Sequence, residues 1–158
     1  MTTRPEKGDK APNVTLPATG AAEINLGRPA EKGHVVFFYP RDNTPGCTTE
    51  SQDFSALKSE FEALGVSIVG VSKDSMKSHD KFIEKKDLTV PLASDEEADA
   101  SEQFGVWVEK NMYGKKYMGI ERSTFLIASD GTILEAWRKV KVKEHGQAVL
   151  AAARAAFA

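Results

Sequence analysis

The sequence predicts an α/β domain in which helices flank a central mixed sheet. In the first half of the chain, apolar runs with strand character alternate with stretches whose apolar residues recur at helical spacing. In the second half, two strand-like runs joined by a turn precede a last helical stretch. The chain has 158 residues, which is enough for a substantial core, and we expect residues 1–158 to form one domain.

The first half begins with two short strands, expected around residues 14–16 and 23–26. Residues 35–39 (VVFFY) are continuously apolar, as is typical of a central strand covered on both faces. Thr44 and Pro45 then indicate a helix start, with a hydroxyl at the N-cap and a proline at the first helical position. The apolar stripe of this helix and the glycine that ends it are Phe54, Leu57, Phe61, Leu64 and Gly65.

The remaining elements follow in order. We expect a strand over 66–71, a helix over 75–86 with Met76, Phe82 and Ile83 inward, a short helix over 96–104, strands over 122–128 and 132–139, and a last helix with Val149, Ala152, Ala153, Ala156 and Phe157 at helical spacing. Asp130 and Gly131 between the two late strands are a strong hairpin signal. This order matches the thioredoxin-like arrangement, with the two N-terminal strands as an extension at the sheet edge.

Composition and charge argue against some partners. Hydrophobic residues make up 41% of the chain and charged residues 28%, which is ordinary for a soluble globular protein. A net charge of −2 gives no broad attraction to nucleic acid or to anionic membranes, so we expect neither as a partner. We therefore interpret two groups of lysines as solvated faces: Lys110, Lys115 and Lys116, and Lys139, Lys141 and Lys143.

The start of the chain, MTTRPEK, is charged and leads into no apolar segment, so we expect no secretory signal. No stretch approaches the length of apolar sequence that spans a bilayer. A single cysteine suits a reducing compartment better than an oxidising one. We expect a cytoplasmic protein.

That one cysteine, Cys47, is the chief candidate for chemistry. The register set by Thr44 and Pro45 places it in the first turn of a helix, among amides without an intrahelical partner and at the positive end of the helix dipole. A thiol there loses its proton more easily. The alternative is a small buried apolar cysteine. Because Pro45 and Gly46 precede Cys47 and polar residues follow it, we expect a polar, accessible thiol.

The spacing of Pro40, Thr44 and Cys47, P-x-x-x-T-x-x-C, resembles the active-site motif of peroxiredoxins. Longer strings resemble the bacterioferritin comigratory protein branch, also called PrxQ. They are FYP (38–40), TPGCT (44–48), FGVW (104–107), GIERSTFLI (119–127) and KVKVK (139–143). The resemblance covers nearly the whole chain, beginning at GDKAP (8–12), and implies a thioredoxin-like fold and a thiol-dependent peroxidase.

A more readily formed thiolate is also a weaker nucleophile, so thiolate formation alone gives only a few-fold gain in rate. The larger contribution must come from donors aimed at the peroxide oxygens. In the motif, Thr44 offers a hydroxyl, Gly46 and Cys47 offer free amides, and Pro40 shields the thiolate from water. The resemblance implies that Arg122 completes the pocket beside the sulfur, where its planar cation suits both the thiolate and the peroxide.

Two charged residues keep alternative roles. Without the resemblance, Arg122 is a surface ion pair with Glu121 or Glu50. Glu50 either orients Arg122 or simply occupies the first helical turn, where a carboxylate is favourable. We interpret Trp107 as core or pocket wall.

Other functional classes fit less well. A Cys–His hydrolase needs an imidazole near Cys47, and we expect His34, His79 and His145 to be surface residues without metal-ligand spacing. A thioredoxin-type redox module needs C-x-x-C, but position 50 is Glu. A non-enzymatic chaperone or binding module has no positive support. The acidic residues 95–99 accompany no phosphate-binding loop, and we expect no cofactor and no metal.

The chain departs from the family pattern at the resolving cysteine. Family members carry it five residues after the first cysteine, where this chain has Gln52, or in the following helix, where it has Ile83. The chain thus resembles a one-cysteine variant. A Cys47 sulfenic acid would then need an external thiol, such as thioredoxin, glutaredoxin or glutathione. The resemblance implies a monomer, with a weak homodimer as the alternative.

Overall fold

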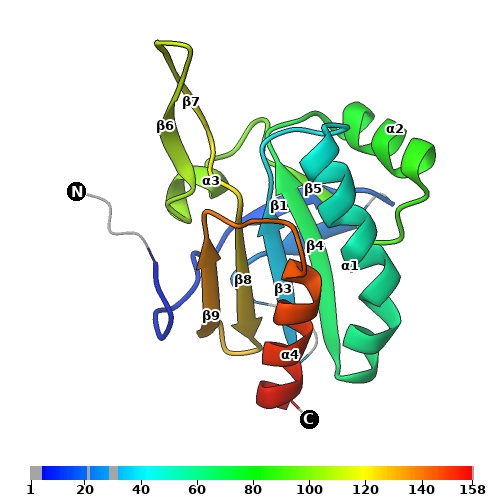
Figure 1. Cartoon of the computed structure of the whole chain (residues 1–158). Helices are drawn as coiled ribbons and strands as arrows, with labels where there is room; N and C mark the ends of the chain where they lie inside the picture. The colour runs from blue at the N-terminus through cyan, green and yellow to red at the C-terminus, as the bar shows by residue number, and fades with distance from the viewer. Residues whose placement is uncertain (1–4, 21, 29–31, 158) are drawn as a thin grey trace.

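A computed structural model of the chain describes residues 5–20, 22–28 and 32–157. Its centre is a seven-stranded mixed sheet of strand order β2-β1-β5-β4-β3-β8-β9, and a separate two-stranded sheet is formed by β6 and β7 (Figure 1). The strands are β1 (Thr15–Ala18), β2 (Ala22–Asn25), β3 (Gly33–Phe38), β4 (Val66–Ser72), β5 (Leu92–Ser94), β6 (Trp107–Met112), β7 (Lys115–Ile120), β8 (Ser123–Ala128) and β9 (Ile133–Arg138).

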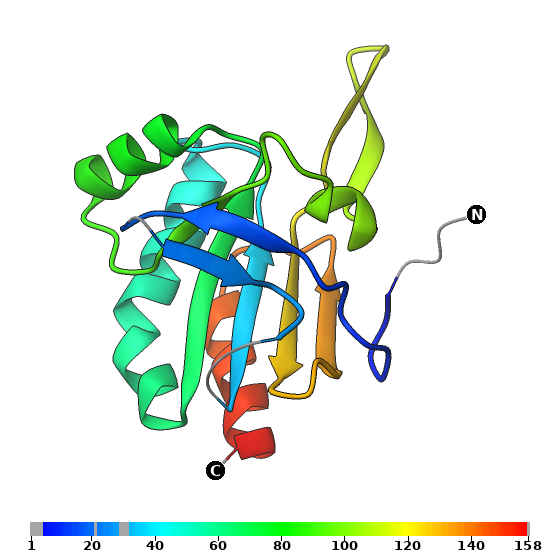
Figure 2. The ribbon, with the colours of Figure 1, turned by 180° about the vertical axis from the view of Figure 1, so that it is seen from behind.

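Four helices accompany the sheet: α1 (Pro45–Ala63), α2 (Met76–Lys86), α3 (Ala100–Gln103) and α4 (His145–Phe157). Helices α1 and α4 lie side by side over one face of the sheet (Figure 1), whereas β1 and β2 cross its other side (Figure 2). The central strand β3 runs parallel to β4 and antiparallel to β8. Among the described residues, no helix is long and apolar enough to cross a membrane.

The sheet separates two hydrophobic clusters, and β3 contributes to both. Val35, Phe37 and Tyr39 pack on the side of α1 and α4, while Val36 and Phe38 pack on the opposite side. This two-sided burial confirms the prediction from the continuous apolar run. The predicted helix start at Pro45 is confirmed, as is its end at Gly65, whose φ of +78° suits glycine.

Three further predictions are confirmed. The β8–β9 hairpin forms, α2 occupies 76–86, and the two N-terminal strands lie at the edge of the sheet. Of the charged segment MTTRPEK, residues 1–4 lie outside the described residues.

The predicted helix over 96–104 is wrong in extent, because α3 begins only at Ala100. The Asp95 carboxylate accepts hydrogen bonds from the amides of Ala100 (2.9 Å) and Ser101 (2.8 Å). This carboxylate satisfies the unpaired amides at the helix start and holds residues 96–98 in a turn before it.

The strands β5, β6 and β7 were not anticipated. β5 is a three-residue strand next to β4. β6 and β7 form a hairpin that projects from the body of the molecule (Figures 1 and 2). Its turn residues Tyr113 and Gly114 both have positive φ, 53° and 80°, as a two-residue hairpin turn requires.

Candidate active site

Cys47 lies in the first turn of α1, as predicted. Thr44 is the N-cap and Pro45 the first helical residue. Thr48 donates its amide to the Thr44 carbonyl at 2.8 Å, whereas no acceptor within the described residues takes the amides of Gly46 and Cys47. Two free donors therefore flank the sulfur at the positive end of the helix dipole.

The expectation of an accessible thiol is wrong, because Cys47 is 0% exposed. It packs in the hydrophobic cluster beneath α1. Cys47, Phe54 and Phe61 recur every seven residues, so they share the helix face that lies on the sheet. The same spacing that buries the two aromatic rings buries the sulfur.

Arg122 brings a cation to this sulfur. Its Nη2 donates to Cys47 Sγ at 3.2 Å, and its Nη1 donates to Glu50 Oε1 at 2.7 Å. Arg122 immediately precedes β8, and β8 pairs with β3, whose end leads to α1. Of the alternatives for Arg122, the ion pair with Glu50 exists, but it is largely buried and shared with the thiol.

Gly46 makes room for the guanidinium. A Cβ at this position would lie 3.0 Å from Arg122 Nη2, closer than most side chains approach. A glycine here therefore lets the arginine lie against the first turn of α1, next to the sulfur.

Glu50 is 1% exposed, and its Oε2 has no hydrogen-bond partner among the residues that the structure describes. Burial raises the pKa of Glu50 to about 7, although the neighbouring Arg122 charge acts in the opposite direction. Burial also lowers the pKa of Arg122, but the nearby Glu50 and Cys47 more than offset this, so the pKa lies above its ordinary value. The site is thus a partly buried cation between a buried thiol and a buried carboxyl group.

Thr44 and Pro40 lie on the rim. The Thr44 hydroxyl makes no side-chain cap bond with the helix, contrary to expectation. It donates instead to the Arg41 carbonyl at 3.0 Å, which leaves its lone pairs available. Pro40 is exposed near the start of the loop that leaves β3.

All three histidines are buried, so the expectation of surface histidines is wrong. His34 Nε2 lies 2.8 Å from the Leu26 carbonyl oxygen. His79 lies between the Asp42 carboxylate and the Ala93 carbonyl. Polar partners within the fold explain how imidazoles in polar sequence stretches become buried.

Two residues that the sequence placed on the surface, His145 and Lys110, are influenced by the charge of Arg122. Burial, and then the Arg122 charge, lowers the pKa of His145 to about 4, and its Nε2 lies 2.8 Å from Thr124 Oγ1. The same two causes hold the pKa of Lys110 below its ordinary value. No local pattern indicated either residue, because both approach Arg122 from distant elements.

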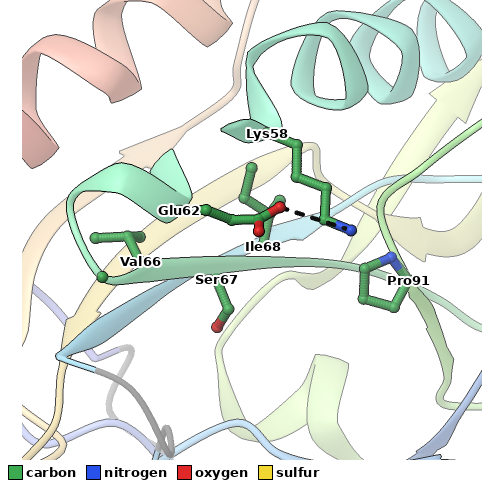
Figure 3. A pocket seen from close by; sticks show the side chains of 7 residues that line it. Lys58, Glu62, Val66, Ser67, Ile68 and Pro91 are labelled. Atoms are coloured by element: carbon green, nitrogen blue, oxygen red, sulfur yellow. Dashed lines mark ion pairs between the residues drawn. The ribbon is translucent and has the colours of Figure 1, made fainter. Parts of the chain in front are cut away.

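A hollow of about 380 Å³ lies at the other end of α1 (Figure 3). Figure 3 shows Lys58 and Glu62 of α1 facing each other across it, 3.9 Å apart, above the start of β4. Because Cys47 lies at the opposite end of the helix, this hollow is separate from the thiol site. Within the described residues, no group of three or more His, Cys, Asp and Glu side chains forms a metal site.

Comparison with known proteins agrees with this arrangement. The model of the AhpC/TSA family matches residues 7–136. The chain belongs to this family. Peroxiredoxin Bcp from Xanthomonas campestris is 50% identical over 143 residues, which are 90% of this chain and 89% of the relative. The chain is therefore a peroxiredoxin of the bacterioferritin comigratory protein or PrxQ branch, with a thioredoxin-like fold, and is a thiol-dependent peroxidase.

A solved structure of the X. campestris bacterioferritin comigratory protein, from work on its alkyl peroxide reduction activity, superposes with a TM-score of 0.84. It is 43% identical, and the match covers 100% of both chains. Serine variants of X. campestris peroxiredoxin Q match with TM-scores of 0.85 and 0.84 at 43% and 45% identity, over 99% and 98% of both chains. They replace cysteines 36 positions apart, and the residue 36 positions after Cys47 here is Ile83.

Proposed function

We propose that this peroxiredoxin reduces hydrogen peroxide and organic hydroperoxides through a Cys47 sulfenic acid that an external thiol resolves. The observation that carries the proposal is the Arg122 guanidinium, which lies 3.2 Å from Cys47 Sγ and is held by Glu50 on its other side. The alkyl peroxide reduction activity named for the X. campestris protein supports the inclusion of organic hydroperoxides.

In the first step, the Cys47 thiolate attacks one peroxide oxygen and the O–O bond breaks. The sulfur becomes a sulfenic acid, and the other oxygen leaves as water or alcohol after taking a proton. Arg122 and the free amides of Gly46 and Cys47 donate to the peroxide oxygens as negative charge develops on them. The Thr44 hydroxyl accepts a hydrogen bond from the peroxide O–H through its free lone pairs.

Two further residues support these groups. Glu50 fixes the guanidinium through its 2.7 Å contact, so that Arg122 presents Nη2 to the sulfur. Pro40, at the rim, has no amide hydrogen and limits the access of water to the first turn of α1.

The second step needs a thiol from outside the chain, because Cys47 is the only cysteine in the sequence. Position 52 is Gln, and Ile83 stands where the spacing of the two X. campestris cysteines would place a second thiol. Thioredoxin, glutaredoxin and glutathione are the candidate reductants. A one-domain, cytoplasmic monomer remains our prediction for the protein as a whole, with a weak homodimer as the alternative.

Cys47→Ser tests the nucleophile. We expect it to abolish peroxide consumption, and mass spectrometry of the wild type after one equivalent of peroxide should show one added oxygen. Each candidate thiol should then add one-to-one as a mixed disulfide, and excess peroxide should drive the sulfur to sulfinic acid. Peroxide reduction that survives in Cys47→Ser would refute the proposal.

Thr44→Val and Arg122→Met test whether these two residues act on the peroxide or on the formation of the Cys47 thiolate. Each should slow peroxide reduction by about tenfold or more, because each removes a group aimed at the peroxide oxygens. Alkylation of Cys47 by a small uncharged reagent should fall much less. Equal losses in both assays would mean that these residues act only through the thiolate or through folding.

Non-reducing electrophoresis after mild oxidation tests the one-cysteine route. We expect a monomer band, because the buried sulfur cannot easily come within bonding geometry of its copy in a second chain. A dominant covalent dimer that cycles with reductant would contradict the external-thiol step.

A further inference from the structure

The β6–β7 hairpin has an unusual surface. Among the described residues, the four large hydrophobic side chains classed as exposed all lie on it: Met112, Tyr113, Tyr117 and Met118. The hairpin projects from the body of the molecule in both views (Figures 1 and 2). Exposed aromatic and methionine side chains on a projecting element are typical of a binding surface.

The strand register divides these side chains between two faces. Met112 pairs with Lys115, and Lys110 pairs with Tyr117, so these four residues share one face. We call it the site face. Met118 pairs with Glu109 and lies on the opposite face.

The site face ends at a hollow that includes the residue next to Arg122 in the chain. At the foot of the hairpin, Val108 and Lys110 of this face line a hollow of about 350 Å³ together with Glu109 of the opposite face, Glu121 and Lys139. Glu121 directly precedes Arg122, whose guanidinium contacts the sulfur. Burial, and then the Arg122 charge, lowers the pKa of Lys110, in agreement with a position of Lys110 on the Arg122 side of the hairpin.

The charge of the hairpin differs from that of the chain. Three lysines and one glutamate give residues 107–120 a net charge of +2, whereas the whole chain carries −2. Lys116, on the opposite face, is 3.7 Å from Glu109, while Lys110 and Lys115 lie on the site face. The site face is therefore apolar and basic.

This charge argues against a second copy of the chain as the occupant. A two-fold dimer through the site face would set the same patch against itself, with Lys110 and Lys115 of each copy close together. Like charges set against each other in an interface oppose association. An acidic surface fits better.

We propose that the site face, Lys110, Met112, Lys115 and Tyr117, docks a thiol–disulfide protein that carries acidic and apolar residues around its reactive cysteine. This inference rests on the proposed function, which requires an external thiol. Docking beside Arg122 would hold the partner's cysteine at the edge of the buried site, where it can wait for the Cys47 sulfenic acid to become reachable.

The chemistry of the docked complex balances. The partner's thiol condenses with the Cys47 sulfenic acid, forming an S–S bond and releasing water. A second thiol of the partner then attacks the partner's own sulfur in that bond, and Cys47 leaves as thiolate. The partner ends as a disulfide, so it supplies the two electrons that the peroxide removed.

Met112→Ser and Met118→Ser form a matched pair, because the two methionines are 55% and 49% exposed on opposite faces of the same hairpin. Turnover is followed with thioredoxin, its reductase and NADPH, with glutaredoxin and glutathione, and with dithiothreitol as a small thiol. For the faster protein reductant, we expect Met112→Ser to lower kcat/KM about tenfold and Met118→Ser to leave it unchanged. Turnover with dithiothreitol should be the same in both variants.

Lys115→Glu and Lys116→Glu form the charge pair. Lys115→Glu should lower kcat/KM for the protein reductant and flatten its decrease with salt, whereas Lys116→Glu should do much less. Equal effects of either matched pair would overturn the proposal. So would protein reductants that are no faster than dithiothreitol, a wild-type dimer that Met112→Ser dissociates, or binding to anionic vesicles that Met112→Ser abolishes.

Peroxide consumption in a single turnover without reductant distinguishes a failure of the proposed function from a failure of the docking proposal. A wild type that forms no sulfenic acid would refute the proposed function. If the wild type forms the sulfenic acid but Met112→Ser and Met118→Ser have equal kcat/KM with every reductant, the docking proposal alone is refuted.

Discussion

Glu50 is a buried acidic residue in the site whose hydrogen-bonding capacity is only partly satisfied within the described residues. Its buried carboxyl group gives one oxygen to Arg122 and leaves the other without a partner. Since burial raises its pKa to about 7, it changes charge near neutral pH. When Glu50 ionises, it compensates part of the charge that Arg122 offers to the sulfur. It is a positioning residue, because it acts through Arg122.

Glu50→Gln should remove a pH dependence. We expect the wild-type rate of peroxide reduction to change slope near pH 7, and the variant to lose that change and to react about tenfold more slowly at higher pH, where the carboxylate holds Arg122 best. Stopped-flow measurement across pH checks this. Asp53→Asn is the control: it should keep the change of slope at slightly lower pH, because the Asp53 charge raises the pKa of Glu50. An unchanged profile in Glu50→Gln would contradict the assignment.

Gly46→Ala tests the space beside the sulfur. A methyl group 3.0 Å from Arg122 Nη2 should push the guanidinium away from Cys47 and slow peroxide reduction by about tenfold. The fold should remain, because Gly46 has no positive φ and alanine is a good helix former. Circular dichroism and a single-turnover assay together check this. Full activity would show that Arg122 needs no such space.

At the scale of elements, a buried polar cluster joins the active-site loop to α2 and β5. The Asp42 carboxylate lies 2.8 Å from His79 Nδ1 and accepts hydrogen bonds from the hydroxyls of Tyr39 (2.6 Å) and Ser78 (2.7 Å). His79 Nε2 donates to the Ala93 carbonyl at 2.9 Å, since that oxygen can only accept. Asp42 lies two residues before Thr44, so the cluster anchors the loop that begins α1.

Breaking this cluster should destabilise the protein. His79→Gln or Asp42→Asn should each lower the free energy of unfolding by about 3 kcal/mol, because each leaves buried polar partners unsatisfied. Ser78→Ala removes one hydrogen bond and should cost about 1 kcal/mol. Urea unfolding measures all three. The double variant should cost less than the sum of the single changes; strict additivity would mean that Asp42 and His79 do not act together.

For the whole molecule, two buried groups oppose each other in pH dependence. The pKa of Glu50 is raised from 4.5 to about 7, so its contribution to stability is present below pH 4.5 and is lost as the pH rises through 7. The pKa of His145 is lowered from 6.5 to about 4, so its contribution is present above pH 6.5 and is lost as the pH falls through 4. Between pH 4.5 and 6.5 the two slopes have opposite sign.

Single substitutions should reveal how each group contributes to the pH dependence of the free energy of unfolding. Relative to wild type, Glu50→Gln should gain stability by roughly 3 kcal/mol as the pH rises from 4.5 to 7, and His145→Gln should lose a similar amount from 4 to 6.5. Urea unfolding at several pH values measures these differences, from which the contributions of other groups cancel. If the stability of both variants changes with pH in the same way as that of the wild type, neither group titrates as stated.

The sequence alone determined the elements whose signals are local. The apolar run of β3 leaves no solvent face, Thr44 and Pro45 begin a helix, Gly65 ends it, and Asp130 and Gly131 turn a hairpin. It also determined the family, because the motif around Cys47 and the later strings lie in a specific order. The β6–β7 hairpin gave no such signal, since most of its residues face solvent and its apolar residues do not alternate regularly with polar ones along either strand.

Only the tertiary structure decided the burial of the polar groups and the distances between them. Cys47, His79 and His145 have polar neighbours in the chain, yet all three are buried, because partners from other elements satisfy or surround them. Arg122 reaches the sulfur from 75 positions away through the pairing of β3 with β8. The pKa of Glu50 depends on desolvation by the packed sheet and helices, and no local pattern contains that information.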